Sequence, residues 1–379
     1  MTALIVLGCF LMLVVIGMPV FAAMGISGLF GMYLLGDTSD LAQRMAFTVS
    51  QAFGSFVLVA VPLYLLVGTL MEQAGFSARL FDFAKKWAGS LKGGLGVATV
   101  GACALFAAIS GSSVATVATI GLVAFPALKE NGYDNDFAGA LIASGGTLGI
   151  LIPPSIAMIL YGVITEQSIS QLFIAGILPG ILLCLMMAIY TSIIARKSQV
   201  SEAFTIKEKL EATCSAGWVL LLPLLILIGI YSGFATPTEA AALAVSYVAI
   251  LGLTTRALNP KKILVATKKA AATSVMIFML LGFGRYLTEF FTLSGLPDAI
   301  VGAVTDFGFS KVSVVIMMAL LYLVLGTVLE AMSMMLITVP ILFPITQALG
   351  IDPLAFGVFV VLAIEAAQIT PPIGINIFT

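Results

Sequence analysis

Long apolar runs alternate with short polar stretches along most of the chain. Runs near or beyond the roughly 20 residues that cross a bilayer cover residues 3–35, 138–161, 172–195 and 218–235. A transmembrane barrel would instead show segments of about ten residues with alternating polarity, and the sequence has no such alternation. The pattern therefore predicts an all-α integral membrane protein in contact with the lipid bilayer.

Composition supports this fold class and excludes several functions. Of 379 residues, 61% are hydrophobic and 9% are charged, whereas soluble domains carry about 25% charged residues. The net charge is −1 and most Lys and Arg residues lie between the apolar runs, so we expect no nucleic-acid partner. Histidine is absent, which excludes histidine metal sites and Ser-His-Asp catalysis. The four cysteines are scattered and predict no disulfide framework.

Basic residues gather in three clusters, at 79–92, 196–209 and 256–269. The positive-inside rule places all three clusters on the cytoplasmic side, so the apolar segments between them must cross the membrane an even number of times. One of these crossings begins with Thr236-Pro237-Thr238-Glu239, which is a capping box with proline at the first helical position. We therefore interpret Glu239 as a helix cap and not as a functional carboxylate.

A single offset of 218 residues aligns two parts of the chain. It carries Phe125-Pro126 onto Phe343-Pro344, Pro153-Pro154 onto Pro371-Pro372, Gly132 onto Gly350 and Asp134 onto Asp352. Shared hydrophobicity would match Leu with Val but would not keep prolines and glycines in register, so the alignment indicates an internal duplication. The loop 79–92 is basic whereas its counterpart, residues 295–312, is not, so we expect the two repeats to be inverted.

The duplication divides the chain into four predicted segments. Residues 1–49 are expected to form N-terminal scaffold helices, and residues 161–269 further scaffold helices with cytoplasmic loops. Residues 50–160 and 270–379 are the two repeats, each with a scaffold helix, a re-entrant hairpin and a broken helix. The amino terminus has no basic leader and is expected to be a retained first helix.

Each repeat contains two interruptions that a simple spanning helix would not tolerate. The first is a polar tip between short apolar arms, at residues 110–113 and again at 330–333. The second is a double proline within an apolar segment, at 153–154 and again at 371–372. Adjacent prolines remove two amide donors and break the helix. Broken backbone persists in a membrane only where it is buried in protein or lines a cavity.

Such a break suits ions, because the half-helix before it ends in carbonyl oxygens that favour Na⁺ and the half after it begins with amides that favour a carboxylate. Hydroxyl groups on short side chains, and glycines that leave the backbone open to a close approach, occur near both breaks. In the first repeat these residues are Ser110, Ser112, Ser113, Gly145, Gly146, Thr147 and Gly149, and in the second they are Gly326, Thr327, Ser333 and Thr370. We predict one sodium site in each repeat. The alternative for any single residue is that it only lets helices pack closely.

Arg285 lies inside the apolar stretch 278–291, where an arginine costs at least ~2.5–3.5 kcal/mol on insertion scales. It therefore needs a partner, and either Glu289 or Glu330 could neutralise it, or it could bind a substrate carboxylate. Asn376, just past the second double proline, is a candidate neutral contact to the substrate. Glu365 is expected to face protein or a water-filled cavity.

Three runs carry a resemblance to a known family, at residues 111–116 (GSSVAT), 175–180 (AGILPG) and 236–242 (TPTEAAA). They resemble the large membrane subunit of tripartite ATP-independent periplasmic (TRAP) transporters, and the resemblance covers essentially the whole chain. It implies an elevator-type carrier of the bacterial inner membrane, multi-pass, with Na⁺ as the coupling ion and no other cofactor. It also implies two partners, a small membrane subunit and a periplasmic substrate-binding protein.

The resemblance also maps site residues. Family sodium sites lie at hairpin tips and helix breaks, which correspond here to Ser112, Ser113, the stretch from Gly145 to Pro153, Ser333 and Thr370. Gly111 and Thr116 of the first run are expected to contact the substrate together with Arg285 and Asn376. The implied substrate is a small organic acid of the C4-dicarboxylate or sialic acid type.

Three other functions are weighed against this one. A stand-alone sodium-dicarboxylate symporter would share the repeat plan but would need no binding protein. An intramembrane enzyme is disfavoured, because no nucleophile with an evident base lies in the apolar segments, and a channel fits duplicated breaks less well than alternating access. A span at 172–195 follows the first repeat and none follows the second, so we expect the natural protein to continue beyond Thr379.

Overall fold

The computed structural model describes residues 1–36, 40–194, 203–370 and 374–378, and within these ranges every regular element is a helix. Seven described helices are long and apolar enough to cross a membrane. An eighth span results if α8 (Asn135–Leu151) and α9 (Ile156–Thr165), which are bent by 40° at the break between them, count as one. The predicted all-α membrane fold class is therefore confirmed.

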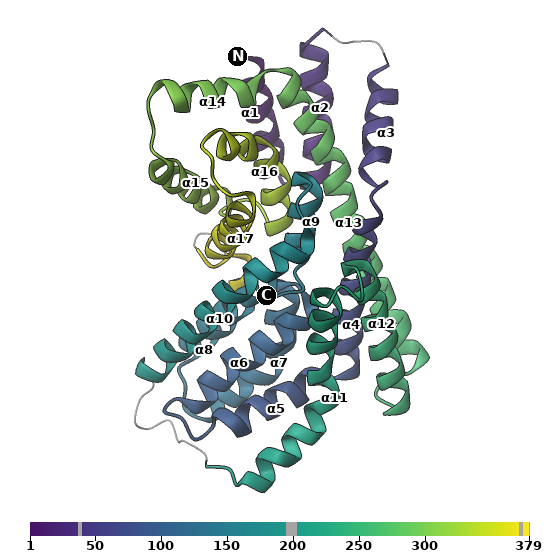
Figure 1. The fold of residues 1–379 in the computed structure, drawn as a ribbon, viewed down its shortest axis with the longest axis vertical. Helices are drawn as coiled ribbons and strands as arrows, with labels where there is room; N and C mark the ends of the chain where they lie inside the picture. The colour runs from purple at the N-terminus through teal and green to yellow at the C-terminus, as the bar shows by residue number, and fades with distance from the viewer. Residues whose placement is uncertain (37–39, 195–202, 371–373, 379) are drawn as a thin grey trace. The chain divides into compact units, whose positions relative to one another are not determined.

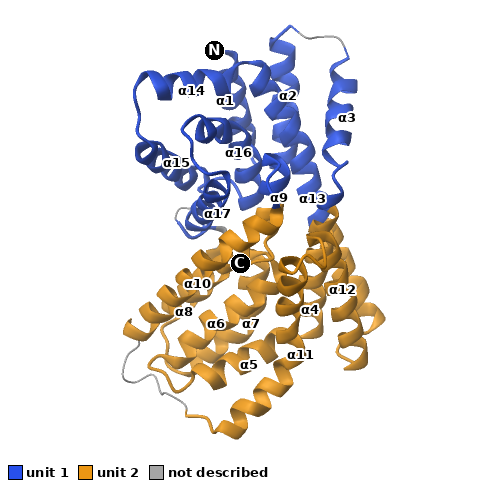
Figure 2. Ribbon diagram, viewed as in Figure 1, with its two compact units in different colours: residues 1–58, 160–168, 273–374 blue, residues 59–159, 169–272, 375–379 orange. Residues whose placement is uncertain are grey.

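The helices form two compact units, drawn in different colours in Figure 2. Unit 1 comprises residues 1–58, 160–168 and 273–374, and unit 2 comprises residues 59–159, 169–272 and 375–379. Unit 1 holds, as labelled in Figure 1, α1 (Thr2–Val15), α2 (Val20–Leu34), α3 (Leu41–Ala52), α14 (Leu296–Asp306), α15 (Lys311–Leu325), α16 (Ala331–Ala348) and α17 (Pro353–Ile369).

Unit 2 holds the remaining complete helices. These are α4 (Ala60–Ala74), α5 (Phe76–Ala88), α6 (Gly94–Ser110), α7 (Ser113–Glu130), α8, α10 (Ile169–Ile194), α11 (Ile206–Tyr231), α12 (Pro237–Thr254) and α18 (Ile375–Phe378). Helix α13 (Pro260–Leu293) and α9 each contribute to both units, and the short 3-10 helix η1 (Phe56–Val59) lies at the boundary in the chain.

In unit 1, three glycines on one face of α2 allow α13 to approach closely. A Cβ atom at Gly25, Gly28 or Gly31 would lie 2.8, 2.8 or 2.6 Å from the rings of Phe283, Tyr286 and Phe290, respectively. Small residues at such spacing are how membrane helices bring their backbones together. The apolar run 3–35 is therefore not one span: it breaks after α1 and places α2 against α13.

A polar cluster joins α3 to α13 in unit 1. The Arg44 Nε lies 3.4 Å from Glu289 Oε1, and the Thr48 hydroxyl donates a 2.8 Å hydrogen bond to Glu289 Oε2. Both partners come from one face of α3, so the carboxylate is held by a cation and a hydroxyl together. This arrangement accounts for a carboxylate near the end of the apolar part of α13.

In unit 2, α4 packs on α12 and on the first part of α13. The Tyr64 hydroxyl donates to the Pro237 carbonyl at 3.2 Å, and the Thr69 hydroxyl to the Ala266 carbonyl at 3.1 Å. The predicted capping box of α12 is confirmed, because Glu239 N donates to Thr236 Oγ1 at 3.3 Å and Thr236 N donates to Glu239 Oε2 at 2.8 Å. Glu239 therefore caps the helix.

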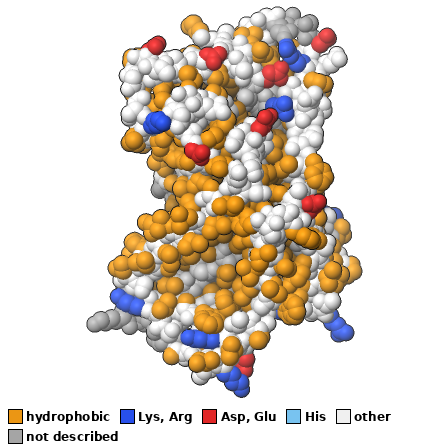
Figure 3. All heavy atoms as spheres, in the orientation of Figure 1, with side chains coloured by type: hydrophobic (Ala, Val, Ile, Leu, Met, Phe, Trp, Pro, Cys, Tyr) orange, Lys and Arg blue, Asp and Glu red, His pale blue; other side chains and the backbone are white. Residues whose placement is uncertain are grey.

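The helix bounds reproduce the offset of 218 residues found in the sequence. Helices α7 and α16 each have 18 residues, and α8 and α17 each have 17, and both pairs begin 218 positions apart. The inverted orientation of the repeats and the four predicted segments stay predictions. Figure 3 shows broad hydrophobic areas with few charged side chains on the face drawn, as expected for a surface that meets lipid.

Candidate functional site

The first polar tip joins α6 to α7 and is held by hydrogen bonds between residues close in sequence. Gly111 has a left-handed φ of +61° and ends α6, and Ser112 is the N-cap of α7, with its hydroxyl accepting a 3.4 Å bond from Ala115 N. The Thr116 hydroxyl donates to the Ser112 carbonyl at 2.8 Å and lies 3.2 Å from the hydroxyl of Ser110. The tip thus gathers the hydroxyls and carbonyls that the sequence singled out.

The first helix break lies between α8 and α9. Pro153 and Pro154 have no amide hydrogen, so the carbonyls of Gly149 and Ile150 lose the donors that a continuous helix would supply. The Ser155 hydroxyl donates to the Ile150 carbonyl and accepts a 3.2 Å bond from Met158 N. The Ile150 carbonyl thus gains a side-chain donor in place of the helical amide that Pro154 lacks.

The tip and the break lie directly against each other within unit 2. A Cβ atom at Gly149 would lie 2.5 Å from the Ser112 carbonyl oxygen and 2.7 Å from Ser113 N. A Cβ atom at Gly111 would lie 2.7 Å from the Pro154 carbonyl oxygen, and Ile156 N donates to the Gly111 carbonyl at 3.4 Å. Two breaks in regular structure, more than 30 residues apart in the chain, therefore form one oxygen-rich site.

Other predicted residues of the first site make packing contacts. A Cβ atom at Gly145 would lie 2.9 Å from the Cys103 sulfur, and one at Gly146 would lie 2.0 Å from a Val117 methyl group, so both glycines admit neighbouring helices. The Thr147 hydroxyl donates to the Ser144 carbonyl of its own helix at 2.6 Å. A sodium-binding role for Gly145 and Thr147 stays a prediction.

The second polar tip joins α15 to α16, and Glu330 caps α16. Its Oε1 accepts 2.8 Å bonds from both Ser333 N and the Ser333 hydroxyl, and its Oε2 accepts a 3.2 Å bond from Met332 N. Glu330 lies 218 positions after Ser112, so the second repeat caps the same helix start with a carboxylate. Glu330 was not among the predicted sodium ligands, although the offset of 218 residues pairs it with Ser112.

The other predicted residues of the second site lie around the ends of α15 and α17. A Cβ atom at Gly326 would lie 2.3 Å from the Ala367 Cβ, so α15 ends against α17. The Thr327 hydroxyl donates to the Val324 carbonyl at 2.7 Å, and the Thr370 hydroxyl to the Ala366 carbonyl at 2.6 Å. Glu365, one turn before the end of α17, is buried. Pro371 and Pro372 lie outside the described residues.

Arg285 lines a cavity of about 260 Å³ inside unit 1. The cavity has polar walls at Arg285, Thr288 and Glu166 and apolar walls at Ala52, Val163, Ile164, Leu281, Leu336 and Pro340. The two structural partners proposed for Arg285 are engaged elsewhere, because Glu289 holds Arg44 and Thr48 and Glu330 caps α16. Within the described residues Arg285 forms no ion pair, and its side chain is exposed to the cavity.

Asn376 lies on α18, which packs on α7 and α8 in unit 2. Its side chain is buried, and among the described residues neither its Oδ1 nor its Nδ2 has a hydrogen-bond partner. It lines a cavity of about 340 Å³ with Gly121, Pro126 and Gly139 among its neighbours. This placement is compatible with the predicted role of a neutral contact, which stays a prediction.

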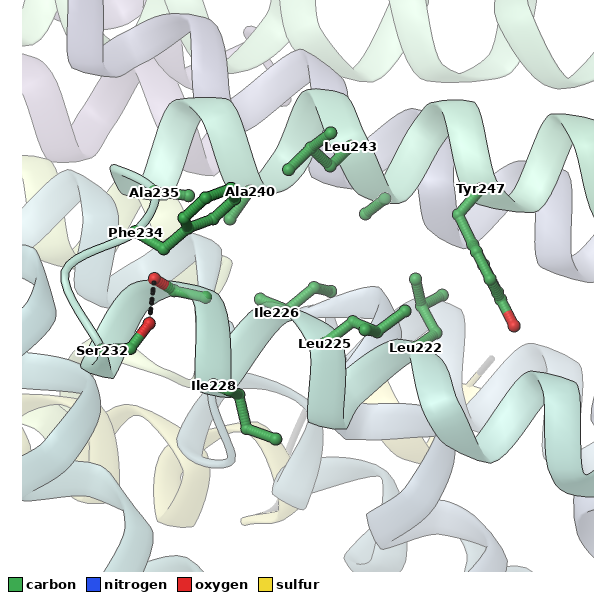
Figure 4. A pocket seen from close by; sticks show the side chains of 12 residues that line it. Leu222, Leu225, Ile226, Ile228, Ser232, Phe234, Ala235, Ala240, Leu243 and Tyr247 are labelled. Carbon is green, nitrogen blue, oxygen red and sulfur yellow. Dashed lines mark hydrogen bonds between the residues drawn. The ribbon is translucent and has the colours of Figure 1, made fainter.

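Another cavity, of about 390 Å³, is a groove between α11 and α12 and is lined by none of the predicted residues. Figure 4 shows Leu222, Leu225 and Ile226 facing Leu243 and Phe234 across it. Its polar groups are peripheral, and the Ser232 hydroxyl donates to the Gly229 carbonyl of its own helix at 3.3 Å (Figure 4). A groove without charge or free polar groups does not recognise a small acid.

Comparison with solved structures supports the fold. The chain is similar to the YdaH transporter of Alcanivorax borkumensis, whose crystal structure was described as revealing an unusual topology, with a TM-score of 0.66 over 100% of this chain and 89% of that chain. At 16% sequence identity this likeness concerns the fold alone.

Comparison with characterised sequences identifies the family. The chain is 38% identical to the C4-dicarboxylate TRAP transporter large permease protein DctM of Pseudomonas aeruginosa, over 94% of this chain and 84% of that protein. It is 36% identical to the isethionate TRAP transporter permease protein DctMQ of Oleidesulfovibrio alaskensis, over 99% of this chain but 59% of that protein. The sequence model of the tripartite ATP-independent periplasmic transporter, DctM component, matches residues 7–379. The chain belongs to this DctM family of TRAP transporter permeases.

Proposed function

We propose that this chain is the membrane subunit that carries a small organic acid across the bacterial inner membrane together with Na⁺. The acid is of the C4-dicarboxylate or sialic acid type and is delivered by a periplasmic binding protein. Family membership supports the carrier function, and the relatives named above act on C4-dicarboxylate and on isethionate. The chain spans only 59% of the length of the isethionate permease, so the transport activity of that whole permease comes to this chain only as part of the proposal.

The contact between the first tip and the first break carries the proposal. It brings the Ser112 carbonyl against the backbone of Gly149 and beside the hydroxyls of Ser110 and Thr116, and these oxygens are all neutral. Neutral oxygen ligands at the ends of half-helices are the kind that coordinates Na⁺ in secondary transporters. The described residues hold no cluster of three or more His, Cys, Asp or Glu side chains that would favour a transition metal at this place.

The second tip is proposed to supply the second sodium site. Its ligands are the carboxylate of Glu330 and the hydroxyl of Ser333. Gly326 and Thr327 precede this tip in the chain, and Thr370 follows the end of α17. A carboxylate adds a negative charge that strengthens cation binding in a medium of low dielectric constant. We therefore infer that the second site binds Na⁺ more tightly than the first.

The substrate is proposed to place its carboxylate against Arg285. A guanidinium forms two parallel hydrogen bonds with a carboxylate. Arg285 lies in a membrane-spanning helix, and its side chain faces a cavity. The roles of Gly111, Thr116 and Asn376, which belong to unit 2, as substrate contacts stay predictions from the sequence. The tips and breaks would then move as one domain against a scaffold that the small membrane subunit braces. This movement would expose the substrate and Na⁺ to each side of the membrane in turn.

Uptake in reconstituted vesicles tests this proposal. Vesicles would contain the permease with its small subunit, and the uptake of labelled acid would be measured with and without the cognate binding protein, in Na⁺ and in K⁺ buffers. We expect uptake only when both Na⁺ and the binding protein are present. Uptake that needs Na⁺ but no binding protein would contradict the tripartite proposal, and uptake at equal rates in K⁺ would contradict sodium coupling.

A further inference from the structure

The cavity around Arg285 contains charges of both signs. Glu166 follows the end of α9 directly, has a left-handed φ of +56° and is exposed. It lines the same cavity as Arg285, and within the described residues neither side chain forms an ion pair. One cationic and one anionic group therefore face a single small space without neutralising each other.

This space must be filled with water and not with lipid. Arg285 lies in the spanning helix α13, and its charge facing acyl chains would be expensive. A charged residue within a span is tolerated where it faces a water-filled cavity or the protein interior. Arg285 is exposed on the cavity wall, as expected if the cavity is filled with water and open to the substrate.

Further charge does not enter the cavity from the helices around it. Glu289, one turn beyond Arg285 on α13, is held by Arg44 and Thr48 of α3 and is not among the lining residues. The walls contributed by α16 and by the end of α3 are Leu336, Pro340 and Ala52. The electrostatic character of the cavity therefore rests on one arginine and one glutamate, with the Thr288 hydroxyl as a neutral donor and acceptor.

We propose that Glu166 makes this cavity selective for acids that carry a single negative charge and, at the opposite end, a hydroxyl or a positively charged group. The anionic group would bind Arg285, and the hydroxyl or cationic group would donate to Glu166. Dicarboxylates in the dianionic form would place their second carboxylate near that of Glu166. This inference rests on the proposed function and, of its two substrate types, favours the sialic acid type, which is a hydroxylated monoanion, over dianionic C4-dicarboxylates.

The size of the cavity gives the expected strength of the selection. A sphere of 260 Å³ is about 8 Å across, so a bound dianion could not move its second charge far from Glu166. Two like charges roughly 8 Å apart, in a medium between water and a protein surface, disfavour binding by about 2- to 30-fold. The same distance favours a cationic group by a similar factor.

Direct binding to the permease separates this selection from that of the binding protein. The permease would be purified with its small subunit, and the affinities for isethionate, ectoine and succinate would be measured by calorimetry in Na⁺ buffer. Isethionate is a hydroxylated monoanion, ectoine a zwitterion and succinate a dianion at neutral pH. Glu166→Gln removes the negative charge and keeps the size, and Glu130→Gln, at an exposed position at the end of α7, is the control for a lost charge elsewhere.

We expect the wild-type permease to bind isethionate or ectoine more tightly than succinate. Glu166→Gln should raise the affinity for succinate relative to the other two by about 2- to 30-fold, and Glu130→Gln should leave the ratio unchanged. An unchanged ratio in Glu166→Gln, or a wild-type preference for succinate, would overturn the inference while leaving the proposed transport intact. Failure to bind any of the three, together with no uptake in vesicles, would count against the proposed function itself.

Discussion

At the scale of single residues, Gly149 is a position in the first site where no side chain fits between α8 and the tip. Gly149→Ala would place a methyl group 2.5 Å from the Ser112 carbonyl oxygen, which is backbone and cannot rotate away. We predict a loss of most sodium-dependent uptake and a destabilisation of about 1–3 kcal/mol, as for overpacked sites. Uptake in vesicles and thermal unfolding measure the two effects.

Gly139→Ala is the matched control for this substitution. Gly139 lies on the same helix, and a Cβ atom there would have no neighbour within 4 Å. We expect this variant to transport as the wild type does. If Gly149→Ala transported equally well, the close approach of the tip to the break would have no part in sodium binding.

Glu330 is the residue whose charge distinguishes the two tips. Glu330→Ala should weaken the apparent affinity for Na⁺ by at least about tenfold, because interactions with a charged group contribute on the order of 1.5–3 kcal/mol. It should also lower the stability by about 0.5–2 kcal/mol through loss of the helix cap. The sodium concentration that gives half-maximal uptake reports the first effect.

Ser310→Ala separates cap loss from sodium binding. Ser310 caps α15, the other arm of the same hairpin, and accepts a 3.2 Å bond from Ser313 N. Its loss should reduce stability by a similar amount without changing the sodium dependence. A similar sodium dependence in Glu330→Ala and the wild type would leave Glu330 with a structural role alone.

Residue roles were the part of the site that the sequence could predict least. The residue types at 110–116 and 145–149 predicted hydroxyl and carbonyl oxygens at the site, but packing decides which neighbour each oxygen faces. The Thr147 hydroxyl, for example, donates to a carbonyl of its own helix. For Arg285 the sequence offered two glutamates as partners, and the three-dimensional structure assigns both to other groups. Periodicity does not encode such choices.

At the scale of elements, the double proline is the feature that determines the first break. In Pro153→Ala/Pro154→Ala the amides of both residues return and can bond to the carbonyls of Gly149 and Ile150. The helix should then become continuous, and we predict that sodium-dependent uptake is abolished while the protein remains folded. Thermal unfolding and uptake are again the measurements.

Pro223→Ala is the control at this scale, since Pro223 also lies inside a spanning helix, α11, but far in sequence from either break. We expect it to retain uptake. Full activity of the double variant would mean that the break is not needed for coupling.

Element positions followed well from the sequence, because prolines, glycines and capping residues act locally. The capping box at Thr236 and the bend at 152–155 were predicted and are observed. The division of residues 3–35 into α1 and α2 was not predicted, although Gly17 and Pro19 lie at the point of division. In a wholly apolar run these two residues are the only signal of a turn.

At the scale of the whole molecule, the family was predictable because its motifs and composition extend along the full chain. The resemblance to TRAP large permeases is confirmed by the family match and by the relatives at 36–38% identity. Membership in this permease family agrees with a multi-pass carrier of the inner membrane and not with an enzyme. The inverted orientation of the repeats stays a prediction from the charge of their loops. The number of sodium ions depends on how oxygens from several helices come together in three dimensions, which local sequence patterns do not encode.

The central claim is that Na⁺ moves together with the acid through sites at the tips and breaks. The most direct test is to measure the entry of ²²Na⁺ and of labelled acid in the same vesicles containing the permease, its small subunit and the binding protein. We predict that both enter at a fixed ratio in the wild type and that Gly149→Ala loses both fluxes. Full acid uptake without any entry of ²²Na⁺ would contradict the account.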